Sequence, residues 1–140
     1  MGVGTDLWNE FVGLMNKQDT AAGASLFASD AVYMGPMENV EGREAIRDYF
    51  AKTDQGLSDT KFETSLLLED GDDLMGEWTY TYTITGPLPF PEGMPQPPSG
   101  TKVKLAGVTV AKVIDGQIAT MRDYYDQVDM MRQMGLMPSS

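Results

Sequence analysis

The sequence predicts an α+β fold in which three helices from the first half of the chain pack on a strongly curved antiparallel sheet. Apolar residues recur at helical spacing in three segments of the first half. From Thr60 onward apolar and polar residues alternate with the period of two that strands require. A bent sheet closed by helices forms a cone, so we expect an internal cavity. The 140 residues suit one domain, residues 1–140.

The three helical segments can be placed by their spacing and caps. The first is expected to begin after a cap at Thr5 or Asp6, and its apolar face extends to Met15. A shorter helix is expected over residues 20–27. The third covers residues 43–55, where an apolar stripe lies opposite a charged outer face.

Strand patterns occupy most of the remaining chain. Residues 31–34 form a short strand, and residues 60–68 form a strand with one apolar face, which consists of Phe62, Thr64, Leu66 and Leu68. Residues 74–85 place Trp78, Tyr80 and Tyr82 on one face, which we expect to pack inside. These strands supply the aromatic wall of the predicted cavity.

The clearest local signal is a hairpin near the end of the chain. Residues 101–114 and 117–125 are joined by Asp115 and Gly116, a pair that favours the tight turns of two-residue hairpins. Both faces of the first strand are largely apolar, which indicates that neither face is fully wet. We therefore expect a layer on the inside and a homodimer contact on the outside.

A long loop precedes this hairpin. Residues 86–100 hold six of the eight prolines, so this stretch can pair little backbone. Its apolar residues are Leu88, Phe90 and Met94. They are compatible with a flap folded over an apolar site and equally with a plain surface excursion.

Composition excludes several kinds of chemistry. The chain has no cysteine and no histidine, so disulfides, Cys/His metal sites, cysteine nucleophiles and histidine triads are ruled out. A formal net charge of −11 opposes binding to nucleic acid or to an anionic membrane. The first residues lack a basic, apolar leader, and no stretch is long enough to span a membrane. We expect a cytoplasmic protein.

A set of short motifs occurs in a fixed order along the chain. The motifs are Asp30-Ala31-Val32-Tyr33, Gly42-Arg43-Glu44-Ala45-Ile46, Thr83-Ile84-Thr85-Gly86-Pro87, Asp115-Gly116-Gln117-Ile118, Arg122-Asp123-Tyr124-Tyr125-Asp126 and Arg132-Gln133-Met134-Gly135-Leu136. This ordered set resembles the SnoaL-like polyketide cyclases, or ester cyclases, of the nuclear-transport-factor-2-like superfamily. The resemblance covers nearly the whole chain and implies a cone-shaped α+β barrel. It also implies an aldol-type ring closure of a polyketide methyl ester, without metal or cofactor.

The resemblance assigns the reaction to one carboxylate. The position of the family's acid is occupied by Asp123, and the position of its partner histidine by Thr109. A buried Asp has its pKa raised by desolvation, so Asp123 is suited to act as a general base on a carbon flanked by two carbonyls. Neighbours on a strand point to opposite faces, so Arg122 should not share its pocket. Glu77 is a weaker candidate acid.

The predicted site combines Asp123 with side chains that would contact a hydrophobic or aromatic small molecule. We expect these to be Thr109, Met121, Tyr49, Tyr33, Trp78 and Met15. No metal ligand is predicted.

Two hypotheses of different kinds remain. The first is an enzyme that needs no cofactor and uses Asp123 for ring closure, with isomerase, dehydratase and epoxide-opening chemistry as close alternatives. The second is a non-catalytic small-molecule-binding or dimerisation module, which the missing histidine suggests.

Overall fold

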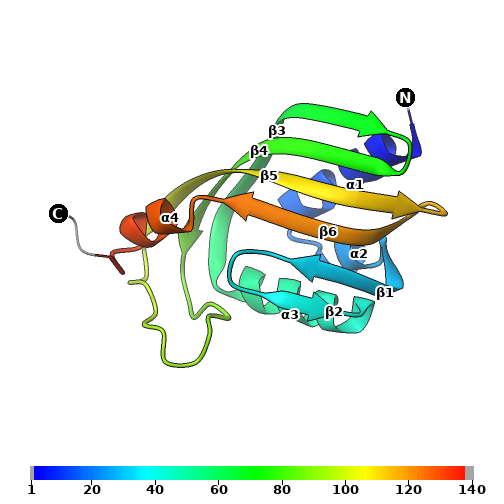
Figure 1. Ribbon diagram of the computed structural model, residues 1–140. Helices are drawn as coiled ribbons and strands as arrows, with labels where there is room; N and C mark the ends of the chain where they lie inside the picture. The colour runs from blue at the N-terminus through cyan, green and yellow to red at the C-terminus, as the bar shows by residue number, and fades with distance from the viewer. Residues whose placement is uncertain (1, 138–140) are drawn as a thin grey trace.

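The computed structural model describes residues 2–137 as four helices and one sheet of six strands (Figure 1). In chain order the elements are α1 (Val3–Asn16), α2 (Thr20–Ala24), β1 (Phe27–Met34), β2 (Asn39–Glu41), α3 (Arg43–Gln55), β3 (Leu57–Asp70), β4 (Asp73–Ile84), β5 (Lys102–Ile114), β6 (Gln117–Tyr125) and α4 (Gln127–Gln133). The predicted α+β fold is confirmed. No helix among the described residues is both long and apolar enough to cross a membrane.

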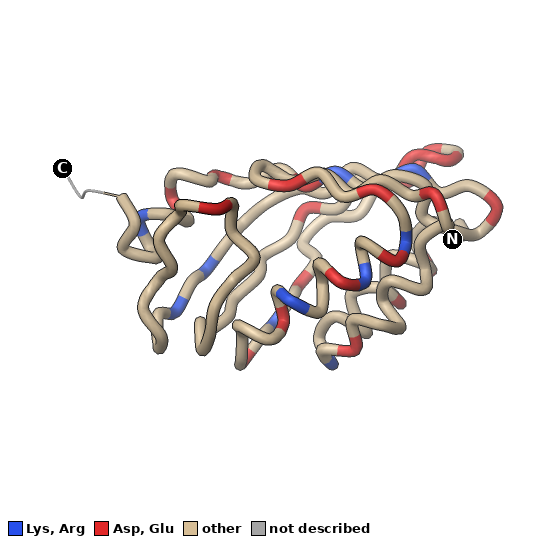
Figure 2. The backbone as a smooth tube through the Cα atoms, turned by 90° about the horizontal axis from the view of Figure 1, so that it is seen from below, with Lys and Arg blue, Asp and Glu red and all other residues tan. Residues whose placement is uncertain are grey.

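The sheet is a curved layer whose strand order is β2-β1-β6-β5-β4-β3. Viewed from below, the sheet lies along the top of the molecule and the helices lie beneath it (Figure 2). All neighbouring strands are antiparallel except β1 and β6, which pair in parallel. This corrects the purely antiparallel prediction. Alternation of residues reveals a strand's faces but not its direction, and no short turn joins these two strands.

The hairpin at Asp115 and Gly116 forms as predicted. Both residues have positive φ, 53° and 75°, as a type I′ turn requires. The turn pairs β5 with β6 so that Thr109 faces Asp123 and Ala111 faces Met121. The register of this hairpin therefore brings the residues of the predicted site together.

The first helix begins two residues before the predicted cap. Its N-cap is Gly2, with no side-chain cap from Thr5 or Asp6. Instead the Glu69 carboxylate of β3 accepts hydrogen bonds from the backbone N–H of Gly4 at 3.2 Å and of Thr5 at 2.8 Å. A carboxylate near the positive end of the helix dipole satisfies these free N–H groups from another element.

One segment boundary and the register of one strand also differ from the prediction. The second helix ends at Ala24, because Phe27 is fully buried and pairs with Ile118 of β6 as the first residue of β1. In β3 the register shifts between Thr64 and Leu66. A bulge turns the following residues to the opposite face.

That bulge changes which leucines reach the core. Leu67 packs against the core, while Leu66 and Leu68 are each 51% exposed on the outer face of the sheet. The predicted apolar face of residues 60–68 is therefore right for Phe62 and wrong for the two outer leucines. The bulged register cannot be predicted from a regular period of two.

The proline-rich loop of residues 86–100 folds against the body of the protein. Leu88 is buried, and Phe90 and Met94 pack against the core. The Gln96 side chain accepts from the Leu88 N–H at 2.8 Å and donates to the Leu88 carbonyl at 2.9 Å. This pair of bonds ties the two arms of the loop to each other. The apolar side chains pack the loop against the core, so the flap alternative is the one observed.

Candidate functional site

A cavity lies between the concave face of the sheet, the helices α1 and α3, and the proline-rich loop. Its volume is about 170 Å³, roughly ten times the space that the centre of one water needs. Its walls are formed by Phe11, Met15, Tyr33, Met37, Glu38, Tyr49, Phe50, Thr53, Asp54, Leu57, Phe62, Trp78, Tyr80, Tyr82, Leu88, Pro89, Phe90, Leu105, Thr109, Met121, Asp123, Tyr125, Met130 and Met134. The cavity is large enough for a ligand of many atoms.

Asp123 is the most strongly organised polar group in this cavity. The Thr109 hydroxyl donates to its Oδ1 at 2.6 Å, and the Tyr33 hydroxyl donates to its Oδ2 at 2.6 Å. Burial raises the pKa of the Asp123 carboxyl above its usual value of 3.8, and these two hydrogen bonds oppose the rise. The carboxyl is thus held in place by donors while lying away from bulk water.

The direction of this hydrogen-bond chain is decided by Trp78. Its indole Nε1–H donates to the Thr109 hydroxyl at 2.8 Å, and an indole N–H can only donate. Thr109 therefore accepts from Trp78 and uses its own hydrogen for Asp123. Because the Thr109 hydroxyl donates to Asp123, this arrangement favours the ionised form of the Asp123 carboxyl.

Glycines on the sheet make room for this chain. Gly107 faces Trp78 in the strand register, and a Cβ there would lie 2.7 Å from the indole ring. Gly76 faces Thr109, and a Cβ there would lie 2.8 Å from the ring of Trp8. Both distances are below any normal contact, so the two glycines allow the indoles to lie flat against the sheet.

All the side chains predicted from the sequence lie on the cavity wall. Asp123, Thr109, Tyr33 and Trp78 form the hydrogen-bonded chain, and the other three line the cavity outside this chain; these are Met121, Tyr49 and Met15. Their roles toward a ligand stay predictions. Glu77, the weaker candidate acid, is exposed on the outer face and accepts a hydrogen bond from Ser65.

Three titratable residues of the cavity were missed. Tyr125 lies two positions after Asp123 on β6, so strand alternation could have found it. Asp54 follows Phe50 by four positions on α3, which places both on one helix face. Glu38 lies in the short connection between β1 and β2, where no periodic pattern points inward.

The electrostatics of the cavity are one-sided. Among the described residues its walls include three carboxyl groups, those of Glu38, Asp54 and Asp123, and no lysine or arginine. Arg122 lies on the opposite face, as predicted, and is exposed. Burial raises the pKa of each of the three carboxyls, and one oxygen of Asp54 has no hydrogen-bond partner. A ligand with a negative charge would meet no compensating group.

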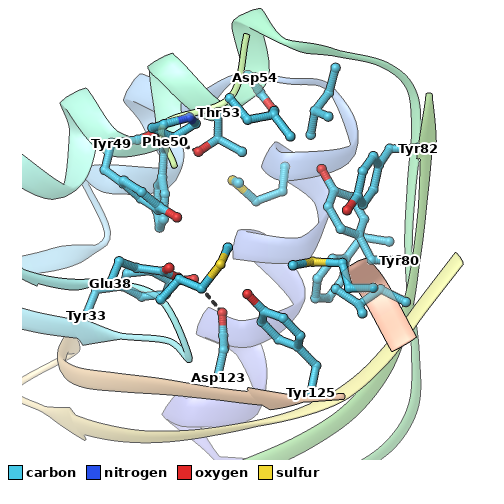
Figure 3. A pocket seen from close by; sticks show the side chains of 18 of the residues that line it. Tyr33, Glu38, Tyr49, Phe50, Thr53, Asp54, Tyr80, Tyr82, Asp123 and Tyr125 are labelled. Carbon is cyan, nitrogen blue, oxygen red and sulfur yellow. Dashed lines mark hydrogen bonds between the residues drawn. The ribbon is translucent and has the colours of Figure 1, made fainter. Parts of the chain in front are cut away.

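The labelled side chains converge on one space (Figure 3). Tyr33, Glu38 and Tyr49 lie on one side, and Tyr80 and Tyr82 lie on the other. Asp54 and Asp123 lie at opposite ends. Burial raises the pKa of the Tyr33, Tyr49, Tyr80, Tyr82 and Tyr125 hydroxyls, so all five stay protonated near neutral pH and can donate hydrogen bonds.

A six-stranded curved sheet closed by helices around a cavity is the fold class that this chain shares with solved proteins described as ketosteroid isomerase-like and NTF2-like. The chain belongs to a particular family of this class, the SnoaL-like polyketide cyclases, whose family profile matches residues 5–134. A search of curated protein sequences finds no match to the chain.

Solved structures agree on the fold. A protein of Shewanella putrefaciens CN-32, named as a candidate SnoaL-like polyketide cyclase, is 16% identical with a TM-score of 0.80, covering 98% of this chain and 99% of its own. A ketosteroid isomerase-like protein of Catenulispora acidiphila DSM 44928, in complex with trimethylamine, is 22% identical with a TM-score of 0.76 over 94% and 93%. An NTF2-like protein of Burkholderia pseudomallei K96243 is 15% identical with a TM-score of 0.79 over 96% and 98%.

Proposed function

We propose that this protein is a small-molecule enzyme that closes a ring in a polyketide ester by an aldol-type reaction, with Asp123 as the base. Membership of the SnoaL-like family supports the reaction class. The observation that carries the proposal is the Asp123 carboxyl, held by Thr109 and Tyr33 inside an aromatic cavity.

The first step is abstraction of a proton from carbon. Asp123 removes the hydrogen from a carbon that lies between two carbonyl groups, and the electron pair of the broken C–H bond moves into the enolate. Such a carbon acid is weak in water, and a carboxylate with a raised pKa is better matched to it than an ordinary one. This step needs no metal.

Ring closure follows within the same molecule. The enolate carbon forms a bond to a second carbonyl carbon, and the electron pair of that carbonyl moves onto its oxygen. Protonation of this oxygen gives a hydroxyl group, so product and substrate have the same composition. When the cavity holds the substrate in a folded conformation, the enolate carbon and the second carbonyl carbon become neighbours. This positioning is the main rate advantage that a shaped cavity provides.

The aromatic wall supports a flat substrate. Tyr80 and Tyr82 lie with ring centroids 5.0 Å apart, and the ring of Phe62 lies 5.5 Å from that of Tyr80; both pairs are tilted. Aromatic surfaces of this kind bury the planar rings of a polyketide favourably. The hydrophobic or aromatic small molecule predicted from the sequence is therefore the partner that we propose.

The test is turnover of an aromatic polyketide methyl ester by wild type, by Asp123→Asn and by Asp72→Asn, an exposed control in the turn between β3 and β4. We expect cyclised product from wild type and Asp72→Asn, and a loss of at least about a hundredfold in Asp123→Asn. Binding without turnover in all three proteins would support the non-catalytic module instead. An isomerised rather than cyclised product would assign the same base to isomerase chemistry.

A further inference from the structure

Glu38 lies in the tight connection between β1 and β2, at the rim of the same cavity. The backbone N–H of Gly35 donates to the Glu38 carbonyl at 3.0 Å and closes a turn. The turn places the Glu38 side chain among the residues that line the cavity. It lies beside Tyr33 and Tyr49 and faces the end of the cavity that Asp123 occupies (Figure 3).

Gly35 is shaped to receive this carboxyl. A Cβ at Gly35 would collide with Glu38 Oε1 and would lie 2.9 Å from its Cδ. The φ of Gly35 is not positive, so the backbone does not require glycine at this position. The Glu38 carboxyl occupies the space next to Gly35 that a side chain at position 35 would fill. This contact fixes the position of the carboxyl without any reference to Asp123.

The groups around Glu38 favour its protonated form. Burial raises the pKa of the Glu38 carboxyl, and the negative charge of Asp123 raises it further, while hydrogen bonds from Tyr49 and from the Met37 backbone act in the opposite direction. Asp123 differs, because both of its oxygens accept from hydroxyl groups. Because two hydroxyl groups donate to Asp123, we assign the ionised form to Asp123 and the protonated form to Glu38.

We propose that Glu38 is the proton donor that acts opposite Asp123, at the oxygen where negative charge develops. The inference rests on the proposed function, because it supplies the acid which that reaction requires. It also accounts for a chain without histidine, in which the position of the implied histidine is occupied by Thr109. The catalytic pair is then two carboxyls in opposite protonation states.

The proton balance is complete. Asp123 takes the proton from carbon and becomes a carboxylic acid. The enolate carbon bonds to the carbonyl carbon, and the Glu38 carboxyl gives its proton to the oxygen of that carbonyl, leaving a carboxylate and a product hydroxyl. After the product leaves, water exchanges protons so that Asp123 is again ionised and Glu38 again protonated. No oxidant, reductant or other reactant is consumed.

A reaction probe tests both carboxyls without knowledge of the natural substrate. Methyl naphthoylacetate is an aromatic β-keto ester whose acidic carbon exchanges hydrogen for deuterium in D₂O, which NMR follows. In this probe negative charge develops on the enolate oxygen, to which the Glu38 carboxyl donates, so we expect Glu38→Gln to lower kcat for the exchange by about a hundredfold, with KM nearly unchanged. Glu41→Gln is the matched control, because Glu41 is exposed on the neighbouring strand β2.

The pH profile separates an acid from a structural residue. In wild type kcat/KM should rise as Asp123 ionises and fall as Glu38 ionises. Glu38→Gln should lose the fall at high pH and keep the rise at low pH. Gly35→Ala should displace the carboxyl and reduce kcat, although Glu38 itself is retained.

A titration provides a readout that does not depend on turnover. The pKa of the Glu38 carboxyl, measured by NMR, should fall in Asp123→Asn because a negative neighbour is removed. An unchanged pKa would overturn the inference. If exchange depends on Asp123 but Glu38→Gln proceeds at the wild-type rate, this inference alone is overturned. If wild type has no activity, the proposed function is overturned as well.

Discussion

The Thr109 hydroxyl on β5 lies 2.6 Å from Oδ1 of Asp123 on β6, and the two residues are direct partners in the strand register. A threonine hydroxyl cannot take up a positive charge as histidine can, so its contribution is a single fixed donor. Because Trp78 donates to the same hydroxyl, Thr109 positions the carboxylate rather than exchanging protons with it.

Replacing Thr109 by Val should therefore impair the base without emptying the cavity. The carboxylate loses one charged hydrogen bond that opposes the effect of burial, so the pKa of Asp123 should rise further. The low-pH limb of kcat/KM for methyl naphthoylacetate exchange should move upward by the same amount. Thr109→Ser retains the hydroxyl and should keep the wild-type profile; an equal shift in both variants would contradict the role of the donor.

Asp123→Asn should change how stability depends on pH. The pKa of Asp123 is raised on folding, so in wild type the free energy of unfolding falls as pH rises from the unfolded value of 3.8 through the folded pKa. Asn at position 123 does not ionise, so the variant lacks this pH-dependent fall in the free energy of unfolding. The Tm of Asp123→Asn minus that of wild type should increase from pH 4 to pH 8 in thermal melts followed by circular dichroism. A Tm difference that decreases with pH would be inconsistent with a raised pKa of Asp123.

The cavity should discriminate against anions. Its described walls contain three carboxyls and no basic side chain, so a negative ligand loses hydration without gaining a partner. By calorimetry methyl naphthoate should bind at least about tenfold more tightly than naphthoate at neutral pH. Asp54→Asn should narrow this gap, because it removes one of the three charges. Equal affinity for the two probes would argue that the ligand occupies a different place.

The two hydrogen bonds between the Gln96 side chain and the Leu88 backbone should affect how tightly the cavity binds a substrate. Gln96→Ala removes both hydrogen bonds to Leu88, each worth about 0.5–1.5 kcal/mol. The wall formed by Pro89 and Phe90 should loosen, with KM for methyl naphthoylacetate rising several-fold and kcat little changed. Faster amide hydrogen exchange at Leu88 is the direct check. A Gln96→Ala protein with unaltered exchange there would show that the loop is held by other contacts.

We propose that the outer face of the sheet forms a homodimer. Leu68 faces Met75 across β3 and β4, and Met75 faces Val110 across β4 and β5. Val108 and Tyr124 lie on the same face, beside the charged side chains of Glu77 and Arg122. Exposed apolar residues that gather on one face of a small protein commonly mark an interface. Sedimentation should give twice the chain mass of 15.3 kDa, and Met75→Glu should give the monomer. Val3→Glu, on α1, is the control; a monomeric wild type rules out the interface.

Local patterns were sufficient for the elements whose stability is local. The hairpin turn at Asp115 and Gly116 follows from two residues that tolerate positive φ, and α3 follows from an apolar stripe with Ile46 and Phe50 at its centre. The start of α1 did not follow, because its free N–H groups are satisfied by Glu69, 65 positions away from Gly4 in the chain. A cap that comes from a distant strand leaves no pattern in the residues around the start of the helix.

The same distinction applies to the candidate site. Asp123 and its neighbour Thr109 could be chosen from the strand pattern together with the family resemblance, and Tyr125 could have been added by alternation. Glu38 could not, because its direction depends on a turn that closes on Gly35 and on the space which that glycine leaves. A residue outside regular structure has no period from which its direction can be inferred.

From the amino acids alone came the α+β class and the absence of thiol and imidazole chemistry, because composition and periodicity are properties of the chain itself. The choice of Asp123 as the acid or base came from the family resemblance and stays a prediction. The closeness of Trp78, Thr109, Asp123 and Tyr33, the parallel pairing of β1 with β6, and the bulge in β3 came only with folding. These features join residues up to 90 positions apart, and such contacts form only when the whole sheet buries its concave face.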